Sequence, residues 1–142
     1  MPSTLAAAIN ASASALAAER TRVEVAVSNI ANAESTRGPD GGPYRRRQVV
    51  LAPDASSGFD GALGQAIGVR VADIRQDDSR FEMRYEPTHP DADEDGWVRI
   101  PNIDTSEEMV DVIGASRAYQ ANLAAINIIR DMIQRALELA RT

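Results

Sequence analysis

The segment 91–96, Asp-Ala-Asp-Glu-Asp-Gly, places acidic side chains at alternate positions and ends in glycine. The calcium loop of an EF-hand begins in this way, with oxygen ligands at its positions 1, 3 and 5 and a glycine at position 6. The remainder of that loop is missing, because its twelfth position needs a bidentate acid and is here Asn102, directly after Pro101. The sequence therefore favours an acidic turn, and a calcium-binding or ligand-binding module using this turn is the alternative.

Other reactive chemistry has few residues to use. His89 is the only histidine, and it stands between Pro87 and Pro90 without an obvious base or orienting group. The chain contains no Cys, which excludes disulfides, thiolate metal sites and a cysteine nucleophile. It contains no Lys either, so all 15 cationic residues are Arg. We therefore predict that the protein is not an enzyme and has no catalytic residue, cofactor or metal site; mutation of His89 would test a hydrolase.

Charge is unevenly distributed along the chain, whose formal net charge is −6. This balance argues against a nucleic-acid partner, since such proteins usually carry a basic surplus. Residues 37–47 are locally basic and residues 91–111 are locally acidic. Opposite patches on one chain can steer self-association, although two solvated loops would show the same composition. The residues predicted to form these inter-subunit charge patches are Arg45, Arg46, Arg47, Asp91, Asp93 and Asp95.

The elements that must carry these loops lie at the two ends of the chain. Over about 3–33, an Ala-rich stretch without Gly repeats larger apolar residues every seven positions, which is typical of a heptad stripe on a helix. The stripe is narrow and flanked by Ala, so it suits close contact between helices better than burial in a broad core. Its members are Ile9, Leu16, Val23, Val27 and Ile30.

A second helix is predicted over about 105–140. Thr105 or Ser106 is the expected N-cap, followed by two acids in the first turn, where the helix dipole favours negative charge. Gly114 is the only glycine of this segment. The predicted stripe on this helix consists of Val112, Tyr119, Leu123, Ile126 and Ile133, with Ala115 three residues after the first of them. We expect the two helices to pair as an antiparallel coiled coil and to meet neighbouring chains.

The middle of the chain differs from both ends. Short alternating or apolar runs at 47–51, 69–74, 81–85 and 97–100 are separated by turn-forming clusters, which predicts extended segments and one or two β-hairpins. Residues 52–66 are expected to form a flexible loop. The predicted organisation is thus 1–36 with the N-terminal helix, 37–104 as a thin β region and 105–142 with the C-terminal helix. The fold class is mainly α with a small β region.

Three stretches of sequence resemble the axial proteins of the bacterial flagellum. The segment 29–36, NIANAEST, is similar to the N-terminal signature of rod, hook and hook-associated proteins, carried here by Asn29, Ile30, Ala31, Asn32 and Thr36. The segments 41–51 and 85–122, GGPYRRRQVVL and YEPTHPDADEDGWVRIPNIDTSEEMVDVIGASRAYQAN, narrow the resemblance to the proximal rod proteins. Another axial subunit is the alternative within this family, and the 85–122 stretch distinguishes the two.

The resemblance implies a structural subunit of the periplasmic rod, the shaft that transmits torque for motility. Its implied partners are further copies of itself, other proximal and distal rod proteins, the rotor ring and rod-adaptor components at the base, and the flagellar type III export apparatus. The resemblance also implies export without signal-peptide cleavage, and an N-terminus with no basic region and no uninterrupted apolar run is consistent with this. No apolar run approaches the roughly 20 residues of a membrane-spanning helix.

Overall fold

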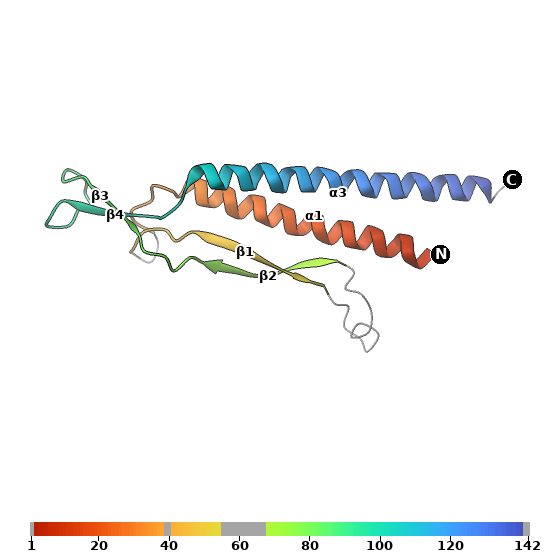
Figure 1. Ribbon diagram of the computed structural model, residues 1–142, viewed down its shortest axis with the longest axis horizontal. Coiled ribbons are helices and arrows are strands. Elements are labelled where there is room, and N and C mark those ends of the chain that lie inside the picture. Colours follow the sequence, from red (N-terminus) through yellow and green to blue (C-terminus); the bar gives the residue numbers. More distant parts are fainter. Residues whose placement is uncertain (1, 39–40, 55–67, 141–142) are drawn as a thin grey trace.

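The structure, a computed structural model, describes residues 2–38, 41–54 and 68–140. Helix α1 (Pro2–Ala31) and helix α3 (Thr105–Leu139) lie side by side and run in opposite directions (Figure 1). The start of α1 and the end of α3 are therefore together, and strands β3 and β4 lie beyond the other end of the pair, whereas β1 and β2 lie beside α1. The predicted fold class, two long terminal helices with a small β region between them, is confirmed.

The N-cap of helix α3 lies one residue before Thr105, the earlier of the two predicted caps. Asp104 is the N-cap, and its carboxylate accepts a hydrogen bond of 2.8 Å from the Ser106 backbone N–H. That hydrogen bond holds the pKa of Asp104 below its ordinary value. Glu107 and Glu108 occupy the first turn as expected. Neither α1 nor α3, over their described residues, has a stretch long and apolar enough to cross a membrane.

Four strands lie in the described ranges, and they form two antiparallel pairs. Strand β1 (Arg47–Pro53) pairs with β2 (Val69–Gln76), and β3 (Glu82–Tyr85) pairs with β4 (Trp97–Ile100). These strands match the predicted extended segments closely, and the β1–β2 ribbon lies along α1 (Figure 1). The predicted loop 52–66 begins two residues inside β1, and its greater part lies outside the described residues.

Fully buried apolar side chains are few in the described part of the chain. The helices bury three alanines, and β4 buries two larger residues while its alternate residues remain exposed. Small side chains allow two helix axes to approach closely, whereas branched residues in β4 fill the inner face of the β3–β4 hairpin. The buried apolar residues are Ala18, Ala26, Ala115, Val98 and Ile100.

Gly68 fixes the start of β2 against α1. Its φ is +131°, and a Cβ placed there would lie 2.8 Å from Ser14 Oγ. The same hydroxyl accepts a hydrogen bond of 3.1 Å from the Val69 N–H and donates one of 2.8 Å to the Ala11 carbonyl. The β1–β2 ribbon is thus held on α1 at Gly68. A larger residue at this position would have neither enough space nor a favourable backbone conformation.

We expect Gly68→Ala to lower the free energy of unfolding by about 1–3 kcal/mol, because it adds backbone strain and displaces the Ser14 hydroxyl. Urea denaturation would measure the change. Gly42→Ala is the matched control, since no atom lies within 4 Å of a Cβ at that position. Equal stability of the two variants would show that the contact of Gly68 with Ser14 does not hold β2 on α1.

Candidate assembly site

The predicted seam residues fall into two groups in the structure. Val27, Tyr119 and Leu123 are 51%, 38% and 45% exposed, and so lie at least partly outside the contact between the two helices. The others are half-buried. They are Ile9, Leu16, Val23, Ile30, Val112, Ile126 and Ile133. These three side chains remain candidates for contact with a second chain, because the partner helix leaves them exposed.

Sequence reasoning missed Ala26, a buried position beside Val27 on α1. Ala26 is 5% exposed, whereas its neighbour Val27 is 51% exposed. The buried residue that follows Val23 in the heptad is therefore Ala26, three positions later, and not Val27, four positions later. The three-residue spacing from Val23 could have identified Ala26. An alanine is hard to distinguish in an Ala-rich helix, however, and the larger Val27 fits the stripe as well.

At the free end of the helix pair the seam opens into an apolar groove. Ile9 of α1 and Ile133 of α3 line it together with Leu5 and Leu137, around a space of about 310 Å³. Two residues predicted for opposite sides of the seam thus line the same groove. No polar side chain contributes to this lining, so the groove is suited to apolar contact rather than to chemistry.

Asn29 joins three elements at the other end of the pair. It is 1% exposed, and all four of its hydrogen-bonding positions are used. Its Nδ2 donates to the Arg47 carbonyl (2.8 Å) and to Glu108 Oε2 (2.9 Å). Its Oδ1 accepts from the Arg47 N–H and from the Tyr44 hydroxyl, both at 3.0 Å. The amide therefore pairs with the backbone of β1 as a neighbouring strand would, and ties it to α1 and α3.

Glu108 supplies the charge at this junction. It is 2% exposed and accepts a 2.6 Å hydrogen bond from Arg46 Nε in addition to the bond from Asn29. Partial burial alone would lower the pKa of Arg46, but the hydrogen bond to Glu108 and the charges of Glu108 and Glu107 raise it above the ordinary value. A buried carboxylate held by a guanidinium and an amide is costly to leave with either partner missing. We call Asn29, Tyr44, Arg46, Arg47 and Glu108 the Asn29 junction.

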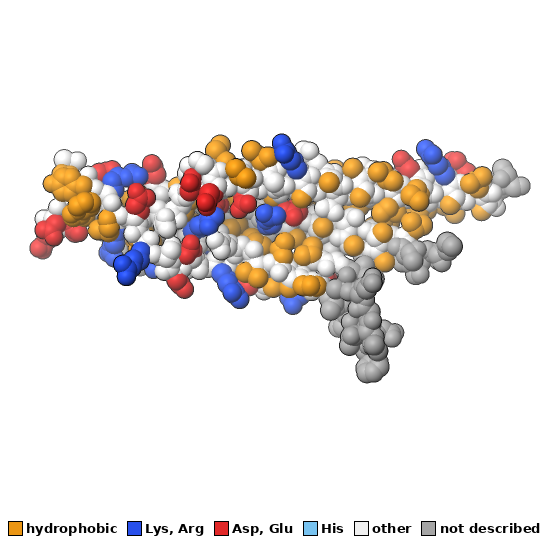
Figure 2. Space-filling view, viewed as in Figure 1, with side chains coloured by type: hydrophobic (Ala, Val, Ile, Leu, Met, Phe, Trp, Pro, Cys, Tyr) orange, Lys and Arg blue, Asp and Glu red, His pale blue; other side chains and the backbone are white. Residues whose placement is uncertain are grey.

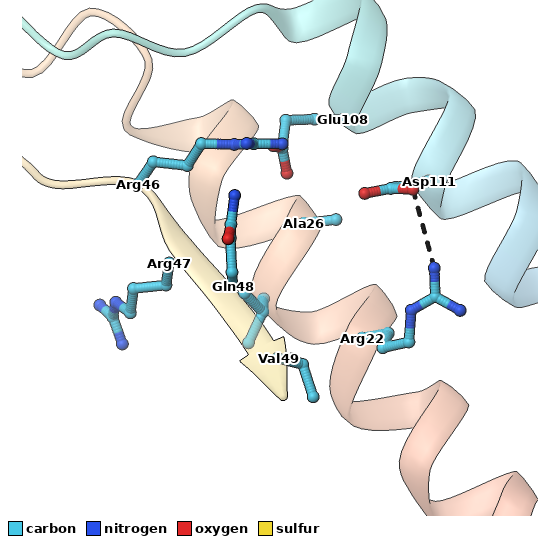
Figure 3. A pocket seen from close by; sticks show the side chains of 9 residues that line it. Arg22, Ala26, Arg46, Arg47, Gln48, Val49, Glu108 and Asp111 are labelled. Atoms are coloured by element: carbon cyan, nitrogen blue, oxygen red, sulfur yellow. Dashed lines mark hydrogen bonds and ion pairs between the residues drawn. The ribbon is translucent and has the colours of Figure 1, made fainter. Parts of the chain in front are cut away.

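An open recess of about 220 Å³ borders the junction on the α1 side. Figure 3 shows Arg46 reaching across it to Glu108, and Arg22 of α1 facing Asp111 of α3, 3.7 Å away. Opposite charges from different elements line this recess and pair with one another. Its geometry is therefore that of a brace between the helices and the strand.

Both predicted charge patches find partners within the chain. Arg46 pairs with Glu108, and Asp91 pairs with Arg37 at 3.3 Å and accepts a 2.8 Å hydrogen bond from Thr36. Arg46 and Asp91 thus have partners inside their own subunit, and a contact of either residue with a second subunit stays a prediction. A contact between subunits remains a prediction for the other members of the patches.

The other members have different surroundings. Arg45 lies 4.6 Å from the centroid of Phe81, and Arg47 lies 5.3 Å from that of Tyr44. Asp93 accepts hydrogen bonds from the backbone N–H groups of Asp95 and Trp97 at 3.1 and 2.7 Å. The acidic tip of the hairpin is thus shaped by its own backbone, as the prediction of a turn requires.

The remaining signature residues close the helix. Asn32 donates from Nδ2 to the Ser28 carbonyl (2.8 Å) and accepts from the Ser35 hydroxyl (3.2 Å), directly after α1 ends at Ala31. Ile30 is half-buried on the last turn. Asn32 therefore closes the helix, whereas Asn29 forms the junction described above.

The alternative chemistries receive no support from the described residues. Within them, no three His, Asp or Glu side chains converge as a metal ion would require. Asp91 and Asp93 are engaged by the contacts given above, and His89 Nδ1 accepts a hydrogen bond of 3.1 Å from the Asp91 N–H. His89 is thus part of the turn that leads into the hairpin.

The fold has the features of a flagellar axial subunit: two long terminal helices, a first helix closed by an asparagine, and a small β region. Comparison with protein families points to the same class. Residues 9–39 match the family model "Flagella basal body rod protein", and residues 94–139 match "Flagellar basal body rod FlgEFG protein C-terminal".

Curated relatives are more specific. The flagellar basal-body rod protein FlgC of Salmonella typhimurium is 46% identical, with 90% of this chain and 92% of the relative covered. FlgC of Borreliella burgdorferi is 42% identical (95% and 97% covered), and FlgC of Bacillus subtilis is 40% identical (94% and 96% covered). The chain belongs to the FlgC family of flagellar basal-body rod proteins. This family is one of structural proteins, and the match favours FlgC over another axial subunit.

Proposed function

We propose that this chain is a structural subunit of the proximal rod of the bacterial flagellum, assembling with further copies and with other rod proteins into the shaft that carries torque. The observation that carries the proposal is the extent of the family match, which covers at least 90% of this chain in each of the three relatives named above. The match therefore includes part or all of each helix and of each strand pair.

The distribution of apolar surface supports the same role. Large apolar side chains such as Val110, Ile113, Ile128 and Met132 are 53–68% exposed on α3. Figure 2 shows apolar side chains along the whole helix pair and a cluster at the hairpin end. Such surface is unusual on a monomer and marks sites of protein contact. The seam predicted from the sequence and this outer surface would together be covered by neighbouring subunits in a tube.

A shaft must also transmit force between its parts. The Asn29 junction connects α1, the start of β1 and the first turn of α3 through buried hydrogen bonds, so the strands cannot turn freely about the helices. The proposed base-side partners are the rotor ring, the rod-adaptor components and the export apparatus, as the resemblance implies. In this proposal the chain is exported without signal-peptide cleavage and lies in the periplasmic part of the basal body.

Complementation tests the proposal directly. The chain is expressed in flagellated cells that lack their own proximal rod protein of this family, and basal bodies are isolated. We expect the chain to be present in the rod and swimming to be restored. A chain that is stably produced in a compatible host but absent from its basal bodies would contradict the proposal.

In the isolated monomer, the two ends of the helix pair should differ in their rates of amide hydrogen exchange. The fully buried residues of the helix pair lie at positions 18–29 of α1 and 108–115 of α3, near the strands. We expect amides in residues 5–14 and 125–137 to exchange about 100-fold faster than those beside the junction, because local opening there exposes little buried surface. Assembly should slow them. Equal protection along both helices in the monomer would contradict the idea that neighbours complete the seam.

A further inference from the structure

The outer face of the β3–β4 hairpin carries large side chains that are not buried. Tyr85 pairs with Trp97 and Met83 with Arg99, and directly opposite residues in a hairpin share one face. Tyr85, Trp97 and Met83 are 61%, 42% and 47% exposed. The two rings meet edge to face with centroids 5.4 Å apart. We call these four residues the aromatic face; it holds the only Trp of the chain.

The hairpin does not need this face for its own packing. Val98 and Ile100, on its opposite face, are 1% and 4% exposed, so that face is already buried. Trp, Tyr, Met and Arg are the residue types enriched in the cores of protein interfaces. Figure 2 shows the apolar cluster at the hairpin end of the molecule, beside acidic side chains. The aromatic face is therefore available for a partner.

The acidic side chains at the hairpin tip indicate that the partner carries positive charge. Asp93, Glu94 and Asp95 form an acidic rim at the hairpin tip, and no ion pair joins them to a cation in the described part of the chain. Exposed aromatic rings beside carboxylates suit an arginine, which can stack on a ring while its charge meets the acids. The partner should therefore present an arginine on a flat, apolar surface.

The outer side of α3 presents such a surface. Gly114, Arg117 and Ala121 follow one another by about one turn and are all exposed, with Val110 at the same side 68% exposed. Over the described residues Arg117 makes no ion pair. A Cβ at Gly114 would meet nothing within 4 Å, so nothing in its own chain requires this glycine, which costs the helix about 1 kcal/mol relative to Ala. We call these four residues the α3 shelf.

We propose that the aromatic face of one copy docks on the α3 shelf of a second copy, with Arg117 beside the rings and the acidic rim. The proposal rests on the proposed function, in that it names one contact by which copies assemble. The two surfaces are both exposed in the same chain and differ from one another, so the contact is heterologous. A heterologous contact leaves one surface of each kind free on the outermost copies and can therefore continue along an assembly.

The absence of Cys makes cross-linking a clean test. Tyr85→Cys and Ala121→Cys are introduced into the full chain, which is oxidised in basal bodies and, separately, as the concentrated purified protein. A disulfide forms only when the two Cβ atoms come within about 4.5 Å. We expect a ladder of covalent multimers, about tenfold more abundant than from the control pair Tyr85→Cys with Ala17→Cys, whose alanine is exposed on α1.

Charge reversal then tests the chemistry of the contact. Arg117→Glu in the double-cysteine chain should reduce the ladder about tenfold, since it sets like charges against each other. Adding Glu94→Arg and Asp95→Arg should restore it. Arg135→Glu, at another exposed arginine of α3, is the control and should leave the yield unchanged.

The outcomes separate this proposal from the proposed function. Basal bodies that contain the chain but give no 85–121 ladder, or that link position 85 to a different rod protein, overturn the docking and leave the rod function standing. A wild-type chain absent from basal bodies contradicts the rod function instead, and the ladder from the purified protein then decides the docking by itself. An equal ladder from the α1 control pair also overturns it.

Discussion

Replacing Asn29 with Asp is expected to disconnect the strands from the helix pair with almost no change in side-chain volume. The asparagine Nδ2 donates to Glu108 and to the Arg47 carbonyl, and an aspartate would present a second carboxylate at both contacts. The position is 1% exposed, so water cannot screen the repulsion. We expect a loss of about 3–5 kcal/mol in the free energy of unfolding, which is a large part of a typical domain's stability.

Matched variants make this result specific. Asn10→Asp places the same change on an exposed position of α1 and should alter stability by less than about 0.5 kcal/mol. Asn29→Ala removes the hydrogen bonds without adding charge, so its loss should fall between the two. Urea denaturation gives the three stabilities, and the fluorescence of Trp97 reports the hairpin. If Asn29→Asp is as stable as Asn10→Asp, the junction does not hold the strands.

A pH series separates charge from shape. The deficit of Asn29→Asp relative to wild type should shrink as pH falls, because a protonated aspartic acid regains one donor and loses the repulsion from Glu108. Burial beside Glu108 is expected to raise the pKa of the new carboxyl, so the destabilisation is full above that pKa and fades as pH falls towards the ordinary pKa of an aspartate. A deficit that does not change with pH would mean that packing, rather than charge, is responsible.

The elements of this fold could be predicted because their signals are local. A seven-residue apolar repeat in Ala-rich sequence specifies two long helices, and turn clusters rich in Gly and Pro separate the four extended segments. The strand bounds differ from prediction by at most two residues at any end. The cap of α3 differs by one residue because Asp104 competes with Thr105 and Ser106, and aspartate is among the best N-caps.

The junction could not be predicted because its partners are distant in sequence. Asn29 and Glu108 are separated by 79 positions, and Arg46 lies in a third segment. A helix-ending signature explains an asparagine locally, so the sequence offers no reason to seek a remote carboxylate. The same limit applies to the charge patches. The sequence shows that one segment is basic and another acidic, but it does not show that the fold brings Arg46 to Glu108 within one chain.

Ile126→Asp is expected to weaken the chain itself and to stop assembly. Ile126 is half-buried on α3, in the predicted seam, and an aspartate there has no cationic partner within the stripe. We expect a loss of about 2–4 kcal/mol in the free energy of unfolding, from a desolvated charge and a lost apolar contact. Cells that carry only this variant should not swim, and basal bodies isolated from them should lack the rod beyond this subunit.

Two neighbouring variants distinguish folding from assembly. Asn127→Asp adds the same charge at an exposed position and should leave both stability and swimming unchanged. Ile128→Asp, at a residue that is 61% exposed, should leave the monomer as stable as wild type yet abolish swimming, because only a neighbouring subunit buries that side chain. Swimming cells with Ile126→Asp would refute the seam. Swimming cells with Ile128→Asp would instead show that the outer apolar side of α3 stays in water in the finished rod.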